Sequence, residues 1–242
     1  MPDTLCDIVA EFVGKPPGLV RGIMIHLHRA TEREPLVKSL ICAVGSLQVL
    51  EAADGAALVA EGHPTICGMD PGIIRTAGEV GCMVSHVTAA RKALADGISH
   101  LVVFEDDCVT ASGFSLTKVR EYLNKIRLFA EEFGLERMDE LVLLSTCGCY
   151  RWRSLAPGVK ATDHFNGSHA YIMGRPIMEK LVGTYEYFLA RGLTAPVDGI
   201  LPLLLQAERR HAFCPQEDTA LFAQNRVIPS YVTSEGTELR KG

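Results

Sequence analysis

The sequence predicts a single α/β domain with a mostly parallel sheet covered by helices on both faces. Through the first half of the chain, apolar segments typical of buried strands alternate with segments of helical spacing, as in successive strand–helix–strand units. The run Leu101–Phe104 is apolar without interruption, which is typical of a strand at the centre of a parallel sheet. A chain of 242 residues can bury a sizeable core without disulfides.

Turn-forming residues and periodicity divide the chain into elements. We expect an N-terminal extension over residues 1–18, a folded domain over 19–230 and a polar tail over 231–242. Strands are predicted at 20–27, 49–53, 101–104, 141–144, 168–173 and 211–213. Helical spacing covers 35–50, 76–96, 114–133, 175–191 and 198–206. The segments 56–74 and 150–165 are predicted to be loops.

Composition and charge narrow the class of protein. The formal net charge of −5 gives the whole molecule no basic surface for nucleic acid. No run approaches the roughly 18 apolar residues of a membrane span, and acids stand where a signal peptide needs bases. We therefore expect a cytoplasmic protein without an integral membrane segment, and peripheral contact with a membrane stays open. The 8 cysteines form no CxxC pair, which fits reduced thiols.

Three adjacent carboxylates, Glu105, Asp106 and Asp107, follow the apolar strand directly. Like charges at this spacing raise one another's pKa and cost stability unless something neutralises them. A hard divalent cation would do so, and it could bridge to a diphosphate at the end of the sheet where open α/β folds bind ligands. Alternation along extended backbone places Glu105 and Asp107 on one side. The alternative is that all three acids cap a turn and face water.

Polar residues on the helix at 76–96 have two interpretations. Glu79, Cys82 and His86 share one side of this helix by their spacing. Glu79 and His86 could line a polar site, or they could be a capping carboxylate and a half-buried histidine. Ser85 and His86 are neighbours and point in different directions, so a Ser/His catalytic pair is not expected.

Asp198 follows Pro196 at the start of a helical segment. Its carboxylate could cap that helix, or it could face a cleft as a general base.

The end of the first strand carries basic side chains. His26 and His28 flank Leu27 and would point to the same face, but the sequence supplies no convincing third metal ligand beside them. Arg29 and Arg33 could bind phosphate groups, or they could belong to a solvated loop. The sequence contains no Walker loop and no GxGxxG motif.

Several segments match one family in order. They are Ile25–Arg33, Ala52–Gly55, Gly78–His86 (GEVGCMVSH), Val103–Asp107 (VFEDD), Gly167–Met173 and Pro196–Asp198. Together they resemble glycosyltransferase family 25, the lipooligosaccharide and procollagen-type galactosyltransferase group, over about residues 22–230. The segment Gly78–His86 is the most specific match, and His26 and His28 depart from the family pattern.

The resemblance implies a GT-A type, Rossmann-like fold and inverting transfer of a hexose, most often galactose from UDP-galactose, to a glycan or glycoconjugate acceptor such as a lipooligosaccharide. It implies Mn²⁺, or Mg²⁺, held by Glu105 and Asp107, with Asp198 as the base. The expected donor-binding residues are Leu27, Arg29, Arg33, Asp54, Glu79, Ser85, His86 and Asp106, and the expected acceptor-binding residues are His169 and Tyr171. Two alternatives stay open: a metal-dependent phosphoesterase or nucleotidyltransferase, and a non-catalytic carbohydrate- or nucleotide-binding module.

Overall fold

The structure is a computed structural model of the chain. It describes residues 3–133, 141–145, 148–167, 169–208, 210–216 and 220–225. The predicted tail at 231–242 and the domain boundary at 230 lie outside the described residues.

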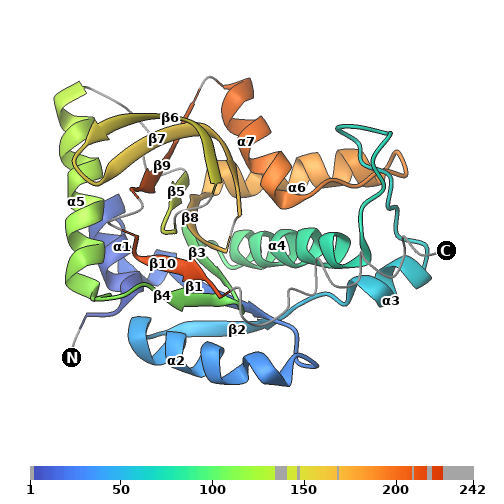
Figure 1. Cartoon of the computed structure of the whole chain (residues 1–242), viewed down its shortest axis with the longest axis horizontal. Helices are drawn as coiled ribbons and strands as arrows, with labels where there is room; N and C mark the ends of the chain where they lie inside the picture. Colours follow the sequence, from blue (N-terminus) through green and yellow to red (C-terminus); the bar gives the residue numbers. More distant parts are fainter. Residues whose placement is uncertain are drawn as a thin grey trace.

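A mixed sheet of eight strands forms the centre of the molecule (Figure 1). Its spatial order is β2-β1-β3-β8-β5-β9-β7-β6. The strands are β1 (Val20–His26), β2 (Leu47–Glu51), β3 (His100–Glu105), β5 (Leu141–Leu143), β6 (Gly148–Ala156), β7 (Val159–Asn166), β8 (Ala170–Gly174) and β9 (Ala212–Pro215). Only β8 and β7 run against the other six strands, so the α/β prediction with a mostly parallel sheet is confirmed.

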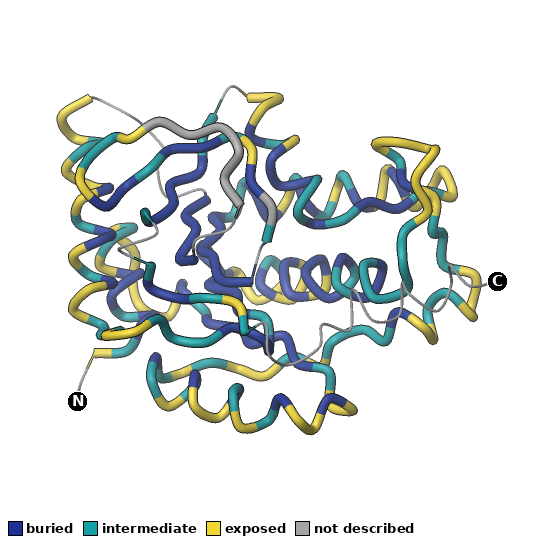
Figure 2. The backbone as a smooth tube through the Cα atoms, in the orientation of Figure 1, coloured by how far each residue is buried: buried dark blue, intermediate teal, exposed yellow. Residues whose placement is uncertain are grey.

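Helices cover both faces of this sheet. They are α1 (Leu5–Val13), α2 (Glu34–Val44), α3 (Gly55–Ala60), α4 (Ala77–Ala95), α5 (Leu116–Phe133), α6 (Arg175–Leu189) and α7 (Val197–Ala207), with short 3₁₀ turns η1 (Pro17–Leu19) and η2 (Thr31–Arg33). Successive strand residues point to opposite faces. In β3, Leu101 and Val103 therefore pack with α4, α6 and α7, whereas Val102 and Phe104 pack with α1, α2 and α5. Figure 2 shows the buried central strands of the sheet, with exposed residues on the outer sides of α2 and α5.

A small second sheet lies beside the acidic cluster. β4 (Cys108–Thr110) pairs antiparallel with β10 (Phe222–Gln224). The backbone N–H of Asn225 donates to the carbonyl of Asp107 at 2.7 Å. This pairing holds residues from the C-terminal part of the chain against the turn that follows β3.

Two of the predicted loops contain regular structure. The segment 150–165, predicted to be a polar loop, forms most of the hairpin β6–β7, which turns at Gly158 with a φ of +85°. β6 is the edge strand of the sheet, and β7 pairs with both β6 and β9, so the backbone of this polar segment is bonded within the sheet and composition misled the prediction. The segment 56–74 begins with α3, whose first turn is capped by Asp54.

The N-terminal extension contains α1, which packs against α5 and β1. Leu5 and Val9 of this helix are fully buried in the core on that face of the sheet. Among the described residues, no helix is both long enough and apolar enough to cross a membrane.

Candidate active site

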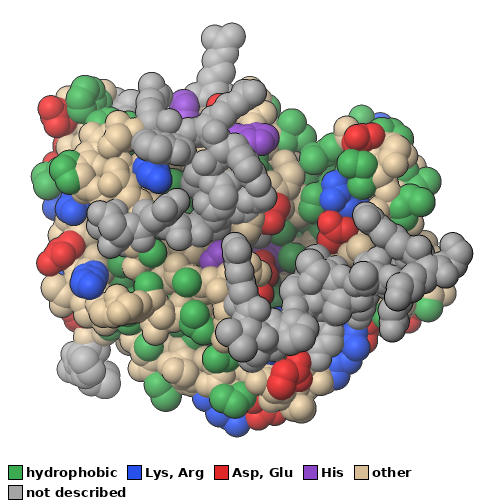
Figure 3. Space-filling model, in the orientation of Figure 1, with side chains coloured by type: hydrophobic (Ala, Val, Ile, Leu, Met, Phe, Trp, Pro, Cys, Tyr) green, Lys and Arg blue, Asp and Glu red, His purple; other side chains and the backbone are tan. Residues whose placement is uncertain are grey.

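A pocket lies at the carboxyl ends of β1 and β3, beside the first half of α4. The space in it that can hold the centres of water-sized molecules is about 90 Å³, and the pocket opens to solvent. Figure 3 shows a hollow near the middle of the molecule, edged by acidic and histidine side chains. Of the residues predicted from the sequence, the pocket is lined by Leu27, Arg29, Arg33, Ser85, His86, Glu105 and Asp106.

Close contact between α3 and α4 shapes one wall of the pocket. A Cβ atom at Gly81 would lie 2.7 Å from the carbonyl oxygen of Ala53, and one at Gly55 would lie 1.7 Å from that of Ala77. Only glycine permits these approaches. The sequence signal for this wall is Gly81 itself, because glycine within a helix weakens it and calls for a packing reason.

Ser85 joins that wall to the end of β2. Its hydroxyl donates to the carbonyl of Gly81 at 2.7 Å and accepts from the backbone N–H of Ala53 at 2.8 Å. The single hydroxyl proton is therefore committed to the backbone, and the expectation that Ser85 and His86 form no catalytic pair is consistent with this geometry.

Asp106 is held by the end of β1. One carboxylate oxygen accepts from the backbone N–H of Leu27 at 3.3 Å and lies 2.9 Å from Nδ1 of His26. The other oxygen bonds to the guanidinium of Arg33, and all three side chains are buried. Asp106 thus joins β3 to the loop after β1, and it partly neutralises the charge that Arg33 brings to the pocket.

Asp107 is buried and turns toward the small second sheet. One oxygen accepts from the amide of Gln224 at 3.0 Å, and the other, Oδ1, has no hydrogen-bond partner among the described residues. Burial raises the pKa of this carboxyl above its usual value, against the lowering effects of Gln224 and Arg33. Gln224 was not among the predicted site residues, because only the β4–β10 pairing brings it here.

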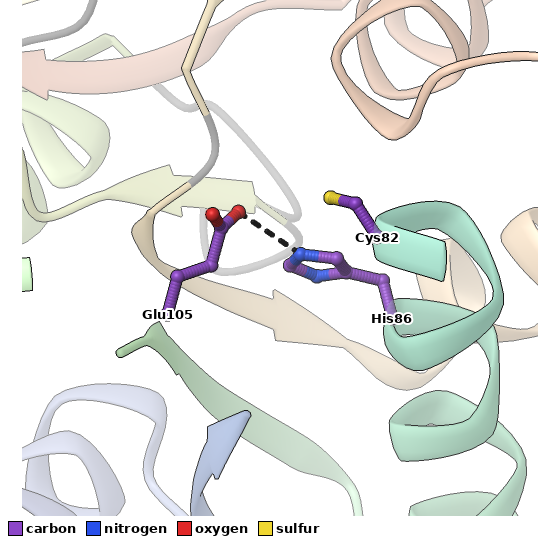
Figure 4. Close-up of side chains that lie close together, drawn as sticks. All are labelled: Cys82, His86 and Glu105. Carbon is purple, nitrogen blue, oxygen red and sulfur yellow. Dashed lines mark hydrogen bonds and ion pairs between the residues drawn. The ribbon is translucent and has the colours of Figure 1, made fainter. Parts of the chain in front are cut away.

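Glu105 points toward α4, where it meets His86. The distance from Nε2 of His86 to Oε1 of Glu105 is 3.1 Å, and Nδ1 of the same ring lies 2.7 Å from the hydroxyl of Tyr171. Figure 4 shows the thiol of Cys82 beside this pair. Tyr171, predicted to contact the acceptor, is fully buried, and its hydroxyl bonds to His86, which lines the pocket.

Several acids affect the ionisation of buried groups at the α4 wall of the pocket. Burial raises the pKa of the Cys82 thiol well above its usual value, and the carboxylates of Glu105, Asp198, Asp107 and Glu79 raise it further. Burial also raises the pKa of Tyr171, with added effects from Glu105, Cys82 and Asp198. Acids that are far apart in sequence therefore act on the same buried thiol.

Asp198 lies in the first turn of α7, where Pro196 occupies the N-cap position. One carboxylate oxygen accepts from the backbone N–H of Gly167 at 2.8 Å, and the other, Oδ1, is buried without a partner among the described residues. The N-cap alternative is therefore wrong. His169 is also buried, and its carbonyl accepts from the backbone N–H of Glu105 at 3.0 Å.

The remaining predicted residues lie around the pocket without lining it. Asp54 caps α3 and pairs with Arg29, whose Nε is 3.2 Å from the carboxylate. Glu79 completes a capping box with Thr76, as the sequence predicted for this helix start, and bonds to Arg75. His28 is exposed and pairs with Glu51, so it does not join the buried His26 at a shared metal site.

Comparison with known proteins gives one family. The model of Glycosyltransferase family 25 (LPS biosynthesis protein) matches residues 24–200. A curated relative, the Lacto-N-neotetraose biosynthesis glycosyltransferase LgtB of Neisseria meningitidis serogroup B, is 26% identical over 149 residues. That match covers 58% of this chain and 46% of the relative, so the chain spans less than half the length of LgtB.

Two solved structures show a distant likeness to this chain. A197 from STIV is 12% identical with a TM-score of 0.42, and the match covers 80% of this chain and 81% of A197. An apo UDP-glucose pyrophosphorylase is 13% identical with a TM-score of 0.40, covering 98% of this chain and 86% of that one.

Proposed function

The chain belongs to glycosyltransferase family 25, and from this premise we propose that its pocket binds a nucleotide sugar and transfers the hexose, with inversion, to a glycan or glycoconjugate hydroxyl. Our choice of donor is UDP-galactose, and our choice of acceptor is a lipooligosaccharide. The name of the relative LgtB, a glycosyltransferase of lacto-N-neotetraose biosynthesis, supports a glycan acceptor. Membership of the family favours glycosyl transfer over the phosphoesterase, nucleotidyltransferase and binding-module alternatives.

The observation that carries this proposal is a pair of carboxylates, each of which has one buried and unused acceptor atom. Oδ1 of Asp107 and Oδ1 of Asp198 are both buried without partners in the described part of the chain. Buried acceptors are rarely left unsatisfied, and an ion or a ligand is a common reason. Oxygen atoms are also the ligands that Mn²⁺ and Mg²⁺ prefer. The unused oxygen of Asp107 supports the implied metal at this residue. We assign Glu105, which ends β3, as a second protein ligand.

Each of the two unused oxygens suits a different task. When bound, the cation would offset the negative charge that develops on the departing diphosphate. Asp198 would accept the proton of the acceptor hydroxyl, whose oxygen then forms a bond to the anomeric carbon as the bond to the diphosphate breaks. The backbone N–H of Gly167 fixes the orientation of the Asp198 carboxylate for this role.

Two arginines that line the pocket, Arg29 and Arg33, would help to bind the donor. Arg29 is about half exposed and pairs loosely with Asp54, so it can turn toward a phosphate. Arg33 is committed to Asp106, and this pair would support the loop against which the nucleotide lies. We expect this chemistry in the cytoplasm, with peripheral contact to the membrane that carries the acceptor.

A donor screen tests the proposal. We expect Mn²⁺ with UDP-galactose to raise the melting temperature of the wild-type protein more than Mn²⁺ with GDP- or CMP-sugars, because a bound ligand stabilises the folded state. Asp107→Asn should lose the manganese-dependent part of this rise. Asp96→Asn, at the far end of α4, should keep it. Equal stabilisation of wild type and Asp107→Asn would remove the metal assignment, and no stabilisation or transfer with any sugar nucleotide would contradict the donor.

A further inference from the structure

Three side chains of metal-binding type meet at the wall of the pocket. Cys82 and His86 lie one helical turn apart on the same side of α4, and Glu105 ends β3 opposite them. One ligand atom from each of the three residues lies within 4.8 Å of the other two. Figure 4 shows the thiol, the imidazole and the carboxylate grouped around one small space.

We propose that Cys82, His86 and Glu105 bind Zn²⁺, a cation that favours sulfur and nitrogen ligands. This site goes beyond the proposed function, since its occupation requires neither a sugar nucleotide nor an acceptor. It shares Glu105 with the manganese assignment and differs from it in its two other ligands.

The spacing of the ligand atoms suits zinc. Zn–S bonds of about 2.3 Å and Zn–N or Zn–O bonds of about 2.1 Å at tetrahedral angles place ligand atoms about 3.3 to 3.7 Å apart. The nitrogen of His86 and the oxygen of Glu105 are already 3.1 Å apart. The sulfur lies within 4.8 Å of both atoms. A side-chain rotation that moves the Cys82 sulfur by about an ångström would bring all three ligand atoms to zinc-binding distances.

The surroundings of the cluster also fit a bound cation. Tyr171 places its hydroxyl 2.7 Å from Nδ1 of His86, where its oxygen can accept a hydrogen bond from the Nδ1–H group and leave the Nε2 lone pair for a metal. The carboxylates of Asp107, Asp198 and Glu79 add negative charge around Cys82. All three ligands line the pocket, so the fourth position of a tetrahedral ion would face its open space.

A hydrogen bond between His86 and Glu105 would account for those two residues without a metal. That hydrogen bond does not explain why the Cys82 thiol lies beside both residues. Zinc would displace the proton of the neutral Cys82 thiol into solvent, and the resulting thiolate selects zinc over manganese and magnesium, which prefer oxygen. The identity of the third side chain is therefore what distinguishes this site from an all-oxygen site at Glu105 and Asp107.

The test uses the full chain without donor, with Co²⁺ as a spectroscopic probe and then Zn²⁺. We expect one equivalent of Co²⁺ to give the absorption bands of tetrahedral cobalt together with a thiolate charge-transfer band, and Zn²⁺ to displace both. Cys82→Ser should lose the charge-transfer band and bind zinc at least about tenfold more weakly. Tyr171→Phe should keep the band with zinc affinity reduced about tenfold. Cys42→Ser, which removes an exposed thiol of α2, should behave as wild type.

Several results would overturn the site. A charge-transfer band that survives in Cys82→Ser would assign the sulfur to another cysteine. X-ray absorption of the zinc-loaded wild-type protein provides a test that does not depend on whether a variant folds. One sulfur ligand with imidazole supports the site, and a shell of oxygen and nitrogen alone contradicts it. Because no sugar nucleotide is present, these results are independent of whether UDP-galactose proves to be the donor.

Discussion

At the scale of single residues, the three adjacent acids at the end of β3 have three different sets of partners. Glu105 meets His86 across the pocket, Asp106 bonds to Arg33 and the end of β1, and Asp107 turns to Gln224. Because each carboxylate bonds to a different partner, the free-energy cost of burying three adjacent acids is lower. This division leaves one oxygen of Asp107 unused, and that oxygen is the main structural support for the metal assignment.

Asp198 provides the test of the catalytic base. Asp198→Asn keeps an acceptor for the backbone N–H of Gly167 but removes the negative charge that would take the proton. We expect kcat for transfer to fall by about 100- to 10,000-fold, with donor binding little changed. Initial rates with the donor and acceptor found by screening, together with calorimetric titration of the donor, would measure both quantities.

The matched control for this prediction is Asp96→Asn, at an exposed acid that occupies the C-cap of α4 and pairs with Arg21. This variant should retain wild-type kcat. If Asp198→Asn also retains it, the base must be another group, and the buried oxygen of Asp198 would need a different explanation.

At the scale of elements, the start of α4 organises the pocket. The capping box of Thr76 and Glu79 fixes where the helix begins, and Gly81 lets α3 and the end of β2 approach its first turns. One helix thus supplies Ser85, which holds the wall, and His86 and Cys82, which face the pocket.

Alanine substitutions in two helices separate packing from helix propensity. In Gly81→Ala the new Cβ would lie 2.7 Å from the carbonyl oxygen of Ala53, so the backbone must shift. We expect a loss of about 1 to 3 kcal/mol in the free energy of unfolding, together with weaker donor binding. At Gly183 in α6 a Cβ meets nothing within 4 Å, so Gly183→Ala should gain about 0.5 to 1 kcal/mol.

Urea denaturation of both variants measures these changes. Equal effects in the two helices would mean that the contact at Gly81 relaxes without cost, and the wall of the pocket would then not depend on it.

Individual elements differed in how far the sequence predicted them. The helix at 76–96 and the strand at 101–104 were predicted closely, because a capping box and an uninterrupted apolar run are local signals. The hairpin β6–β7 was not, since its polar residues become a strand pair only beside β9. The contact of Asp107 with Gln224 could not be predicted from the sequence either, because 117 residues separate the two.

At the scale of the whole molecule, the sheet separates two apolar cores, and the N-terminal extension belongs to one of them. Cys6 in α1 is buried there beside β1, and burial, reinforced by Asp7, raises the pKa of its thiol to about 11 from 9.0. A raised thiol pKa means that the folded state favours the neutral form. Its contribution to stability is therefore complete below pH 9 and is lost as the pH rises toward 11.

This shift predicts an alkaline loss of stability that depends on Cys6. Relative to its value at pH 8, the free energy of unfolding of wild type should fall by about 1 kcal/mol more at pH 10 than that of Cys6→Ala. Cys42→Ala, which removes an exposed thiol, should follow wild type. Denaturant titrations across this pH range measure the difference, and parallel curves for wild type and Cys6→Ala would contradict the burial of Cys6.

The sequence by itself determined the α/β class and the family, and it proposed the acids of the candidate site, since periodicity, capping residues and short motifs all lie in consecutive residues. Only the tertiary structure decided which carboxylate oxygens are satisfied and which are unused. It also decided that Cys82, His86 and Glu105 share one small space. The reason is physical: hydrogen bonding, burial and charge at a side chain depend on neighbours that are far away along the chain, and folding alone brings those neighbours together.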